Sequence, residues 1–499
     1  ETFGNNDGRV NPGEYIEISI PVKNYGEITE TNLTVDIFSE NSVVTFENSS
    51  ETISTINPNE EVLLTYYMTV NENAIDGEEL GIILTVSDIN INQTHSYIPI
   101  YIYGPRLIFN SYEYMSGSII NPGETKLIKI ELKNIGNELV QNISGSLNDP
   151  SNTISTNMTL FEWTGINSDQ TSFSNYVEIT ADNNLVNGSV VPLQIHLTSI
   201  NGYDRTIPLN LQVGESTVSD PLGPDQYGYY IYDYGDLGYS LAAIYDWVEI
   251  DPNYGGLGQS LNLLDDGDGN PGLQQTTTID LPFNFSFYGI EYDQISICTN
   301  GWISFGETSM TSFRNYSIPG AGGPSPMIAA FWDDLKTSQG NVYTYFDSNS
   351  QEFIVQWSDM YTYNHNDEND FQIILYNSLT PTGDGEVKIQ YKTYNNTSTP
   401  SNSGWAPSHG AYATIGIENH EGNDGLEYSF HNQYAPTALP LQDESAIFIS
   451  TRPSIPLLMA DVDASGVINI VDVVQIVNFI LNPSLDLLTP TQKYVADLN

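Results

Sequence analysis

Residues 11–26 read NPGEYIEISIPVKNYG, and residues 121–136 read NPGETKLIKIELKNIG. The Asn-Pro-Gly-Glu turns start at positions 11 and 121 and the Lys-Asn-x-Gly turns at positions 23 and 133, so both recur with an offset of 110. Asn32-Leu33-Thr34 and Asn142-Ile143-Ser144 share that offset. Between the turns every second side chain is apolar, which is the pattern of a strand with one face toward a core. The sequence therefore predicts a duplicated all-β unit.

Each copy is about 100 residues of short alternating runs separated by turn residues, a size and pattern typical of an immunoglobulin-like β-sandwich. We expect one sandwich over residues 1–103 and a second over 104–214. The turn pattern also resembles the adhesion-type and spacer sandwiches of bacterial surface proteins. That resemblance brings no catalytic residues with it.

The composition changes after Gly214, where Tyr and Gly become dense in YGYYIYDYGDLGYS (residues 227–240). From 215 to 453 the alternating runs predict one larger β-sandwich domain, jelly-roll-like in type. Its segments LPFNFSFYG, SICTNGWISFG, MIAAFWDDL, FIVQWSDM and TGDGEVKIQY resemble a sandwich domain found next to gingipain-like cysteine peptidases. The expected strands are 281–288, 294–299, 302–305, 342–346, 353–357, 371–376, 387–391, 413–418 and 446–450.

Residues 461–472 read DVDASGVINIVD, with oxygen-bearing groups at the loop positions that an EF-hand uses to bind calcium. The sequence departs from that pattern at position 5, which is Ser, and at position 12, where Asp replaces Glu. A hard divalent cation needs about six to eight oxygen ligands. We therefore predict a Ca²⁺ site formed by Asp461, Asp463, Ser465, the Val467 carbonyl, Asn469 and Asp472.

One helix is expected after the loop, because residues 473–481 have apolar side chains at helical spacing and Asn482-Pro483 ends the run. A loop followed by one helix resembles half of a type I dockerin, the module that joins proteins to cohesin receptors. The resemblance covers residues 454–499, where a second copy begins at 497–499, so we expect either a trimmed fragment or an incomplete module. It implies that Ile470 and Val471 contact a cohesin-like receptor or another copy of the chain. We expect calcium to order the loop and the apolar helix face to pack.

Other candidate sites lie in the large domain. Asp265, Asp266 and Asp268 have a spacing that suits calcium, as do the acids of 367–370, although neither follows a defined motif. Trp405 lies in a polar loop and offers a flat ring for a glycan. The tryptophans in apolar runs are instead expected in the core: Trp302, Trp332 and Trp357.

The charge balance limits the classes of partner. There are 13 Lys+Arg against 63 Asp+Glu, a formal charge of -50, and such a surface repels nucleic acid and anionic membranes. The single cysteine, Cys298, excludes an intramolecular disulfide framework. The sequence contains no run of 18 apolar residues, so it does not predict insertion into a membrane. We expect an extracellular protein of a bacterial cell surface.

Catalytic signatures are weak. Cys298 follows apolar residues inside a predicted strand, the six histidines form no zinc motif, and Asp333 and Asp334 are neighbours at a strand end. We therefore expect no enzyme here, and any catalytic domain would precede Glu1. The predicted function is non-catalytic: a structural or adhesion protein that presents a β-sandwich and docks through its calcium-dependent end. The alternatives are the accessory part of a secreted gingipain-like peptidase or polysaccharide-degrading enzyme, and a subunit of a surface filament or surface layer.

Overall fold

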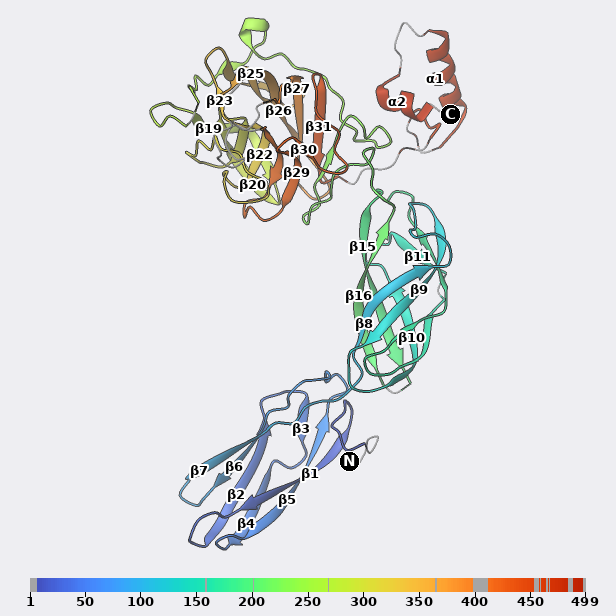
Figure 1. The fold of residues 1–499 in the computed structure, drawn as a ribbon, viewed down its shortest axis with the longest axis vertical. Helices are drawn as coiled ribbons and strands as arrows, with labels where there is room; N and C mark the ends of the chain where they lie inside the picture. The colour runs from blue at the N-terminus through green and yellow to red at the C-terminus, as the bar shows by residue number, and fades with distance from the viewer. Residues whose placement is uncertain are drawn as a thin grey trace. The chain divides into compact units, whose positions relative to one another are not determined.

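The computed structural model describes residues 7–157, 159–200, 202–267, 269–363, 366–397, 412–452, 457, 459–463, 465, 467–482 and 488–496. Antiparallel strands dominate, and the two α-helices of the described residues lie near the C-terminus (Figure 1), which confirms the all-β prediction. The chain forms two compact units. The first comprises Glu1–Asp182 and Val190–Val213, and the second comprises Asn183–Ser189 and Gly214–Asn499.

The first repeat is a two-sheet sandwich in the first unit. Tyr66 and Met68 from one sheet and Val35 from the other are buried in a common core, because alternate residues of each strand point inward. One sheet has the order β1 (Tyr15–Lys23), β5 (Glu61–Val70), β3 (Val44–Phe46), and the other β4 (Ser50–Ile56), β2 (Glu30–Ser39), β6 (Ile82–Ser87), β7 (Gln93–Ile98).

The second repeat is also built from two sheets. Trp163 is buried, and its Nε1 donates to the carbonyl of Ile130, in β9 (Thr125–Asn134), at 3.1 Å. One sheet has the order β12 (Phe161–Ile166), β10 (Val140–Asn148), β15 (Ser189–Ser199), β16 (Asp204–Val213). The other has β11 (Ile154–Thr156), β14 (Val177–Ala181), β9 (Thr125–Asn134), β13 (Thr171–Phe173), with β8 (Leu107–Tyr114) also on β9.

The residues repeated in the sequence make equivalent contacts in both copies. The Asn11 and Asn121 N–H groups each donate to the glutamate three residues later, at 2.9 Å in both copies. The backbones of Asn32 and Asn142 are left-handed, with φ of 56° and 48°. The residues on either side of each Asn pair with the neighbouring strand, but the Asn itself does not. Asn tolerates this conformation better than most residues. The repeated Asn therefore has a structural explanation in the left-handed backbone at this position of the strand.

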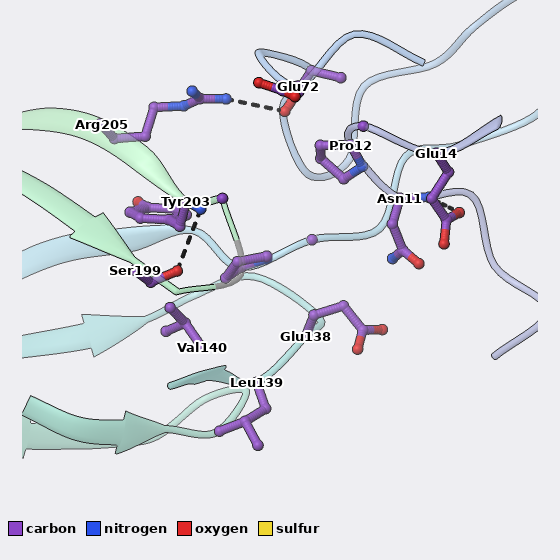
Figure 2. A pocket seen from close by; sticks show the side chains of 15 residues that line it. Asn11, Pro12, Glu14, Glu72, Glu138, Leu139, Val140, Ser199, Tyr203 and Arg205 are labelled. Carbon is purple, nitrogen blue, oxygen red and sulfur yellow. Dashed lines mark hydrogen bonds between the residues drawn. The ribbon is translucent and has the colours of Figure 1, made fainter. Parts of the chain in front are cut away.

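A cavity of about 510 Å³ lies in the first unit, and Figure 2 shows its lining. Its charged side chains include Glu14, Glu138 and Arg205. Glu14 accepts the Asn11 N–H at 2.9 Å, Glu138 pairs with Arg9 at 2.7 Å, and Arg205 donates to the Ala74 carbonyl at 3.2 Å. These groups hold neighbouring loops together.

The large domain has two sheets around one core. The core joins Ile303 and Ile328 from one sheet to Val355, Ile373 and Ile389 from the other. The eight-stranded sheet contains β17 (Tyr230–Tyr232), β31 (Ser445–Ser450), β27 (Gly385–Thr393), β26 (Glu368–Leu379), β25 (Glu352–Thr362), β24 (Asn341–Asp347), β18 (Gln259–Ser260) and β23 (Leu335–Lys336). The seven-stranded sheet contains β19 (Thr276–Phe287), β20 (Ile290–Cys298), β21 (Trp302–Phe305), β22 (Met327–Trp332), β28 (Thr414–Glu418), β29 (Gly425–Phe430) and β30 (Gln433–Tyr434).

Three tryptophans are fully buried in the large domain, as the sequence predicts. Trp357 stacks on Phe371 with ring centroids 5.0 Å apart, and its Nε1 donates to the Cys298 carbonyl at 2.9 Å. Trp302 and Trp332 both donate to the Ser312 carbonyl. Each indole N–H therefore has a partner inside the core, as a buried Trp requires.

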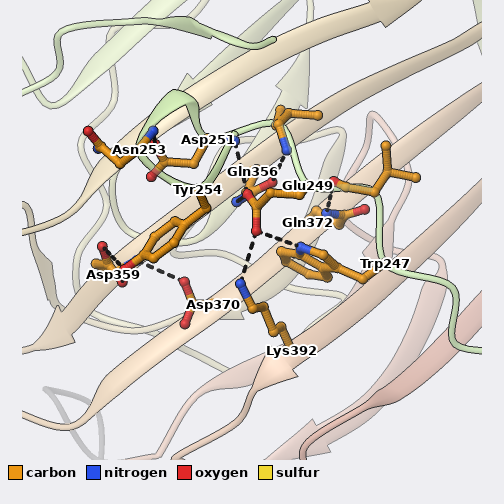
Figure 3. A network of polar contacts seen from close by, with 12 residues as sticks. Trp247, Glu249, Asp251, Asn253, Tyr254, Gln356, Asp359, Asp370, Gln372 and Lys392 are labelled. Atoms are coloured by element: carbon orange, nitrogen blue, oxygen red, sulfur yellow. Dashed lines mark hydrogen bonds and ion pairs between the residues drawn. The ribbon is translucent and has the colours of Figure 1, made fainter. Parts of the chain in front are cut away.

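A row of glutamines on the eight-stranded sheet binds an extended segment over residues 246–250. Gln356 pairs with Gln372 across the strands, and Gln372 with Gln390. Gln390 exchanges two bonds with the Asp246 backbone, Gln372 donates to the Val248 carbonyl, and Gln356 accepts the Ile250 N–H. These bonds and the short helix η1 (Pro252–Tyr254) place Trp247 and Tyr254 above the sheet (Figure 3).

The C-terminal module has two helices, α1 (Ile470–Leu481) and α2 (Pro490–Ala496). A small core of Val462, Leu488 and Val495 packs with Ile476 and Phe479 of α1. The expectation that the apolar run 473–481 packs was wrong for most of it, because the small core faces only one side of α1. The side chains left exposed are Val473, Val474, Val477, Ile480 and Leu481.

Candidate metal centre

Three aspartates of the predicted calcium loop come together in the C-terminal module. One carboxylate oxygen each from Asp461, Asp463 and Asp472 lie within 4.8 Å of one another. Asp461 and Asp472 are buried, and Asp463 is half-buried. Three acids this close repel one another unless a cation lies between them.

The backbone of the loop turns these carboxylates inward. The Ser465 N–H donates to Oδ1 of Asp461 and to Oδ1 of Asp463, both at 3.0 Å. The Asp463 N–H donates to Asp472 Oδ1 at 3.1 Å, and the Ser465 hydroxyl lies 3.2 Å from the Val467 carbonyl oxygen. Carboxylate, hydroxyl and carbonyl oxygens are the ligands that calcium prefers. Asp461, Asp463, Ser465, Val467 and Asp472 therefore fit a calcium ion and would hold it here.

Asn469, which the sequence predicts at position 9 of the calcium loop, also caps the helix that follows. It is the N-cap of α1, and its Oδ1 accepts the Val471 N–H at 2.8 Å. Asp472 Oδ2 in turn accepts the Asn469 N–H at 2.7 Å, which completes a capping box. That backbone bond is the main reason that the pKa of Asp472 is lowered. Asp472 thus connects the acidic loop to the first turn of the helix.

The face of α1 beside the loop is apolar and open. Ile470 and Leu481 are each 71% exposed, and Val474 and Val477 are 49% and 44% exposed. These four residues are spaced as one stripe along a helix. Val471, the other residue that the dockerin resemblance assigns to a partner, is 47% exposed.

The other predicted metal residues in the large domain are arranged differently. Asp265 is buried, and its carboxylate accepts hydrogen bonds from the Gly267 N–H, the Gln275 amide and the Thr299 hydroxyl. Burial raises the pKa of Asp265. Asp266 accepts a bond from Asn270 instead. Asp265 therefore fastens its loop to Thr299, directly after β20, and the predicted Asp268 and Trp405 lie outside the described residues.

A second acidic group forms on the eight-stranded sheet. Oxygens of Asp359, Glu368 and Asp370 lie within 4.8 Å of one another. Figure 3 shows the two aspartates of this group. The sequence pointed to Glu368 and Asp370, within 367–370, but not to Asp359, which lies in a bulge of β25 with φ of 51°. The Asp359 N–H donates to Asp370 Oδ1 at 3.0 Å, and the Tyr254 hydroxyl donates to Asp359. A bulge has no periodic signature in sequence, so only the folded strand shows this neighbour.

The same face carries a basic group. Lys392 Nζ lies 2.9 Å from Glu249 Oε2, and 5.6 Å and 4.9 Å from the ring centroids of Trp247 and Tyr254. A lysine ammonium over two rings and beside a carboxylate is held by cation–π and ionic contacts. These contacts fasten residues 247–254 to the sheet.

The candidates for catalysis lie in unsuitable surroundings. Cys298 is buried at the end of β20, and burial raises its pKa to about 12, whereas a thiol nucleophile needs a lowered pKa. Asp333 and Asp334 are also fully buried, and burial raises the pKa of Asp333 to about 7. Neither aspartate side chain is open to a substrate.

Comparison with known proteins gives one family match, in the large domain. Residues 261–454 are similar to the family described as NIDO-related. No curated protein matches the chain. No helix in the described part of the chain is long and apolar enough to span a bilayer.

Several solved structures share local similarity. Red sea bream transglutaminase is 11% identical at a TM-score of 0.22, and the match covers 42% of this chain and 30% of the transglutaminase. A Porphyromonas gingivalis W83 protein of unknown function is 14% identical at a TM-score of 0.16, and the match covers 41% of this chain and 94% of that protein. The secreted serine protease VesC of Vibrio cholerae is 11% identical at a TM-score of 0.16, and the match covers 35% of this chain and 44% of the protease. At such TM-scores none of these likenesses carries a functional argument.

Proposed function

We propose that this chain is a non-catalytic structural or adhesion protein of the extracellular bacterial surface. Its β domains present a binding surface, and its C-terminal module docks with calcium to a cohesin-like receptor or to another copy of the chain. The observation that carries the proposal is the pairing of the Asp461, Asp463 and Asp472 group with the open apolar stripe of α1.

Charge explains why calcium is part of the proposal. The chain has 63 acids and 13 basic residues, so few side chains are available to neutralise clustered carboxylates. A metal ion that binds only the folded loop stabilises it, because its binding free energy adds to folding. Since Asp472 also caps α1, the ion would fix the helix together with the loop.

The apolar stripe explains why docking is part of the proposal. Contiguous exposed apolar surface on a soluble protein marks an interaction site more often than isolated apolar residues do. Ile470, Val474, Val477 and Leu481 form one row, while Ile476 and Phe479 on the other side pack within the module. The row therefore remains available for a partner helix or sheet.

Hydrogen exchange on the full chain tests the calcium step. In calcium chloride we expect slow exchange over 470–481, and in EDTA fast exchange there with unchanged β strands. The variant Asp472→Ala should exchange rapidly in both buffers, whereas the control Asp359→Asn, in the other acidic group, should respond as the unmutated chain does. Equal protection of α1 in calcium and in EDTA would refute the calcium step.

Binding measurements test the docking step. We expect the full chain either to bind a type I cohesin module in calorimetry or to dimerise in sedimentation velocity, in calcium only. Val474→Asp places a charge in the stripe and should abolish the interaction, while Asn478→Asp adds the same charge at an exposed polar position of α1 and should preserve it. Absence of both interactions in calcium, with α1 formed, would overturn docking.

A further inference from the structure

The two repeats of the first unit differ at one edge of a sheet. In the second repeat β8 pairs antiparallel with β9, from Leu107 opposite Asn134 to Tyr114 opposite Ile128. The offset of 110 makes β1 the counterpart of β9. Among the residues that the structure describes, β1 pairs with β5 alone and forms the end of its sheet. Over these residues the outer edge of β1, on the side away from β5, therefore has no counterpart of β8.

Strand β8 closes one side of the second repeat. It contacts β16, which belongs to the other sheet, as well as β9. Leu132 and Asn134 of β9 are fully buried, and Leu107 of β8 is 2% exposed. The counterparts of Leu132 and Asn134 are Val22 and Asn24, which are only half-buried, and β7, the counterpart of β16, is exposed along most of its length. The first repeat thus exposes a side of its sandwich that the second repeat covers.

A repeated asparagine shows the same difference in its hydrogen bonds. The Oδ1 atoms of Asn24 and Asn134 each accept the N–H of the glycine two residues later, at 2.8 and 3.0 Å. Asn134 Oδ1 also accepts the N–H of Arg106, the residue before β8, at 3.1 Å, and the Ile135 N–H donates to the Arg106 carbonyl at 2.8 Å. From the described residues Asn24 Oδ1 receives no such second bond. An amide oxygen accepts two hydrogen bonds, so Asn24 can receive an N–H from an added strand.

A groove of about 300 Å³ lies at this exposed side of the first repeat. It is bordered by Asn24, directly after β1, and by Thr94 of β7 in the other sheet. In the second repeat Leu107 pairs with Asn134, so an apolar side chain in the position of Leu107 would lie at this groove. The apolar lining of the groove comes from both sheets: Val22, Leu33, Ile56 and Val86.

The charged lining of the groove is mainly acidic. It includes the carboxylates of Glu30 and Asp88, while the Lys23 ammonium lies over a tyrosine ring, 5.2 Å from its centroid. A strand that enters as β8 does places its preceding residue beside Asn24, and in β8 that residue is Arg106. A basic residue there would meet the two carboxylates, and opposite charges across an interface favour the correct partner.

We propose that the outer edge of β1 and the adjoining groove bind an extended segment of a different protein, antiparallel to β1, in which a basic residue precedes apolar residues at alternate positions. In such strand addition main-chain hydrogen bonds give affinity and side-chain pockets give specificity. Pro21 of β1 has no N–H to offer. Its counterpart Glu131 lies where β8 shifts register between Phe109 and Ser111, so the added strand bulges at the proline. This surface is separate from the C-terminal docking proposed above.

Peptide binding to the full chain in EDTA tests the surface, because EDTA suppresses the calcium-dependent docking. The probe is a fluorescent peptide of residues 105–114, PRLIFNSYEY, which includes the strand that fills the equivalent edge in the second repeat. We expect saturable binding by fluorescence anisotropy. The peptide with Leu107→Asp should bind more weakly by about tenfold or more, since it loses a buried apolar side chain. Absence of saturable binding, or equal binding of both peptides, would overturn the proposal.

Matched variants of the full chain locate the binding. Val22→Asp places a charge in the groove and should abolish peptide binding. Leu63→Asp adds the same charge at a 63% exposed position of β5 and should preserve binding. Equal effects of the two variants would overturn the assignment to the groove.

Hydrogen exchange of the unmutated chain gives a measurement that does not depend on Val22→Asp folding. With the peptide bound, we expect slower exchange over β1 and unchanged exchange over β9. Slower exchange over β9 alone would overturn the site and show that the peptide replaces β8. Self-association in EDTA that the peptide reverses in sedimentation velocity would overturn the choice of a different protein and assign the strand to a second copy of this chain.

Discussion

In the large β domain the big apolar side chains are inside, whereas in the C-terminal module most of those on α1 are outside. In the large domain Trp302, Trp332 and Trp357 are fully buried. In the C-terminal module Ile470 and Leu481 are the most exposed large apolar residues of α1. Burial of its own apolar core offsets the conformational entropy that the large domain loses on folding. The module has a small core and a capping carboxylate, so we expect it to depend on an ion and a partner.

The largest expected effect comes from removing a core tryptophan. Trp357→Ala should destabilise the large domain by about 3–5 kcal/mol, because it leaves a cavity and removes the stack on Phe371. Urea unfolding followed by tryptophan fluorescence measures the loss, with the exposed Leu379→Ala as control. If this variant also reduced the protection of α1 against hydrogen exchange as much as that of the large domain, the large domain and the C-terminal module would not be independent.

A pH series separates the two regions further. Asp333 keeps its proton in the folded state up to about pH 7, while an unfolded aspartate releases it near pH 4, so the large domain should lose stability as the pH rises between these values. Each unit of pKa difference contributes about 1.4 kcal/mol. The C-terminal module should not lose stability over this pH range, because the pKa of its Asp472 is lowered.

Asp333→Asn checks the assignment of that pH effect. Melting curves of this variant should depend less on pH than those of the unmutated chain, and the exposed Asp293→Asn should leave the dependence unchanged. An equal pH slope in Asp333→Asn and in the unmutated chain would show that another group is responsible.

The helix cap should have a moderate effect confined to the module. Asn469→Ala removes the acceptor for the Val471 N–H and should destabilise α1 by about 1 kcal/mol. Hydrogen exchange over 470–481 measures it. Asn469→Ser, which retains a capping oxygen, should be close to the unmutated chain; equal losses in both variants would argue against a capping role.

The smallest effect should come from the open stripe. Val477→Thr should change the stability of the isolated chain by less than about 0.5 kcal/mol, since the side chain is already in solvent. The same substitution at buried Val387 should cost clearly more, because it buries a hydroxyl group in the core. Comparable losses in thermal melts would mean that the stripe is covered within the chain.

Much of the large domain was predictable from local pattern. The run expected at 302–305 is β21 (Trp302–Phe305), and the run expected at 387–391 lies within β27 (Gly385–Thr393). Helix α2 was missed, although Thr489-Pro490-Thr491-Gln492 has the pattern of a capping box with proline at the first helical position, and Gln492 bonds back to the Thr489 N–H. That signal was present in the sequence.

Most strands of the large domain and the acidic loop could be read from the sequence alone, because alternation, turn chemistry and ligand spacing are local properties. Which charged groups meet, and which apolar side chains stay exposed, depends on the folded chain. Asp359 reaches Asp370 through a bulge, and α1 leaves its apolar stripe open. These outcomes depend on which segments pack against one another, and contacts between distant residues leave no periodic trace in a single sequence.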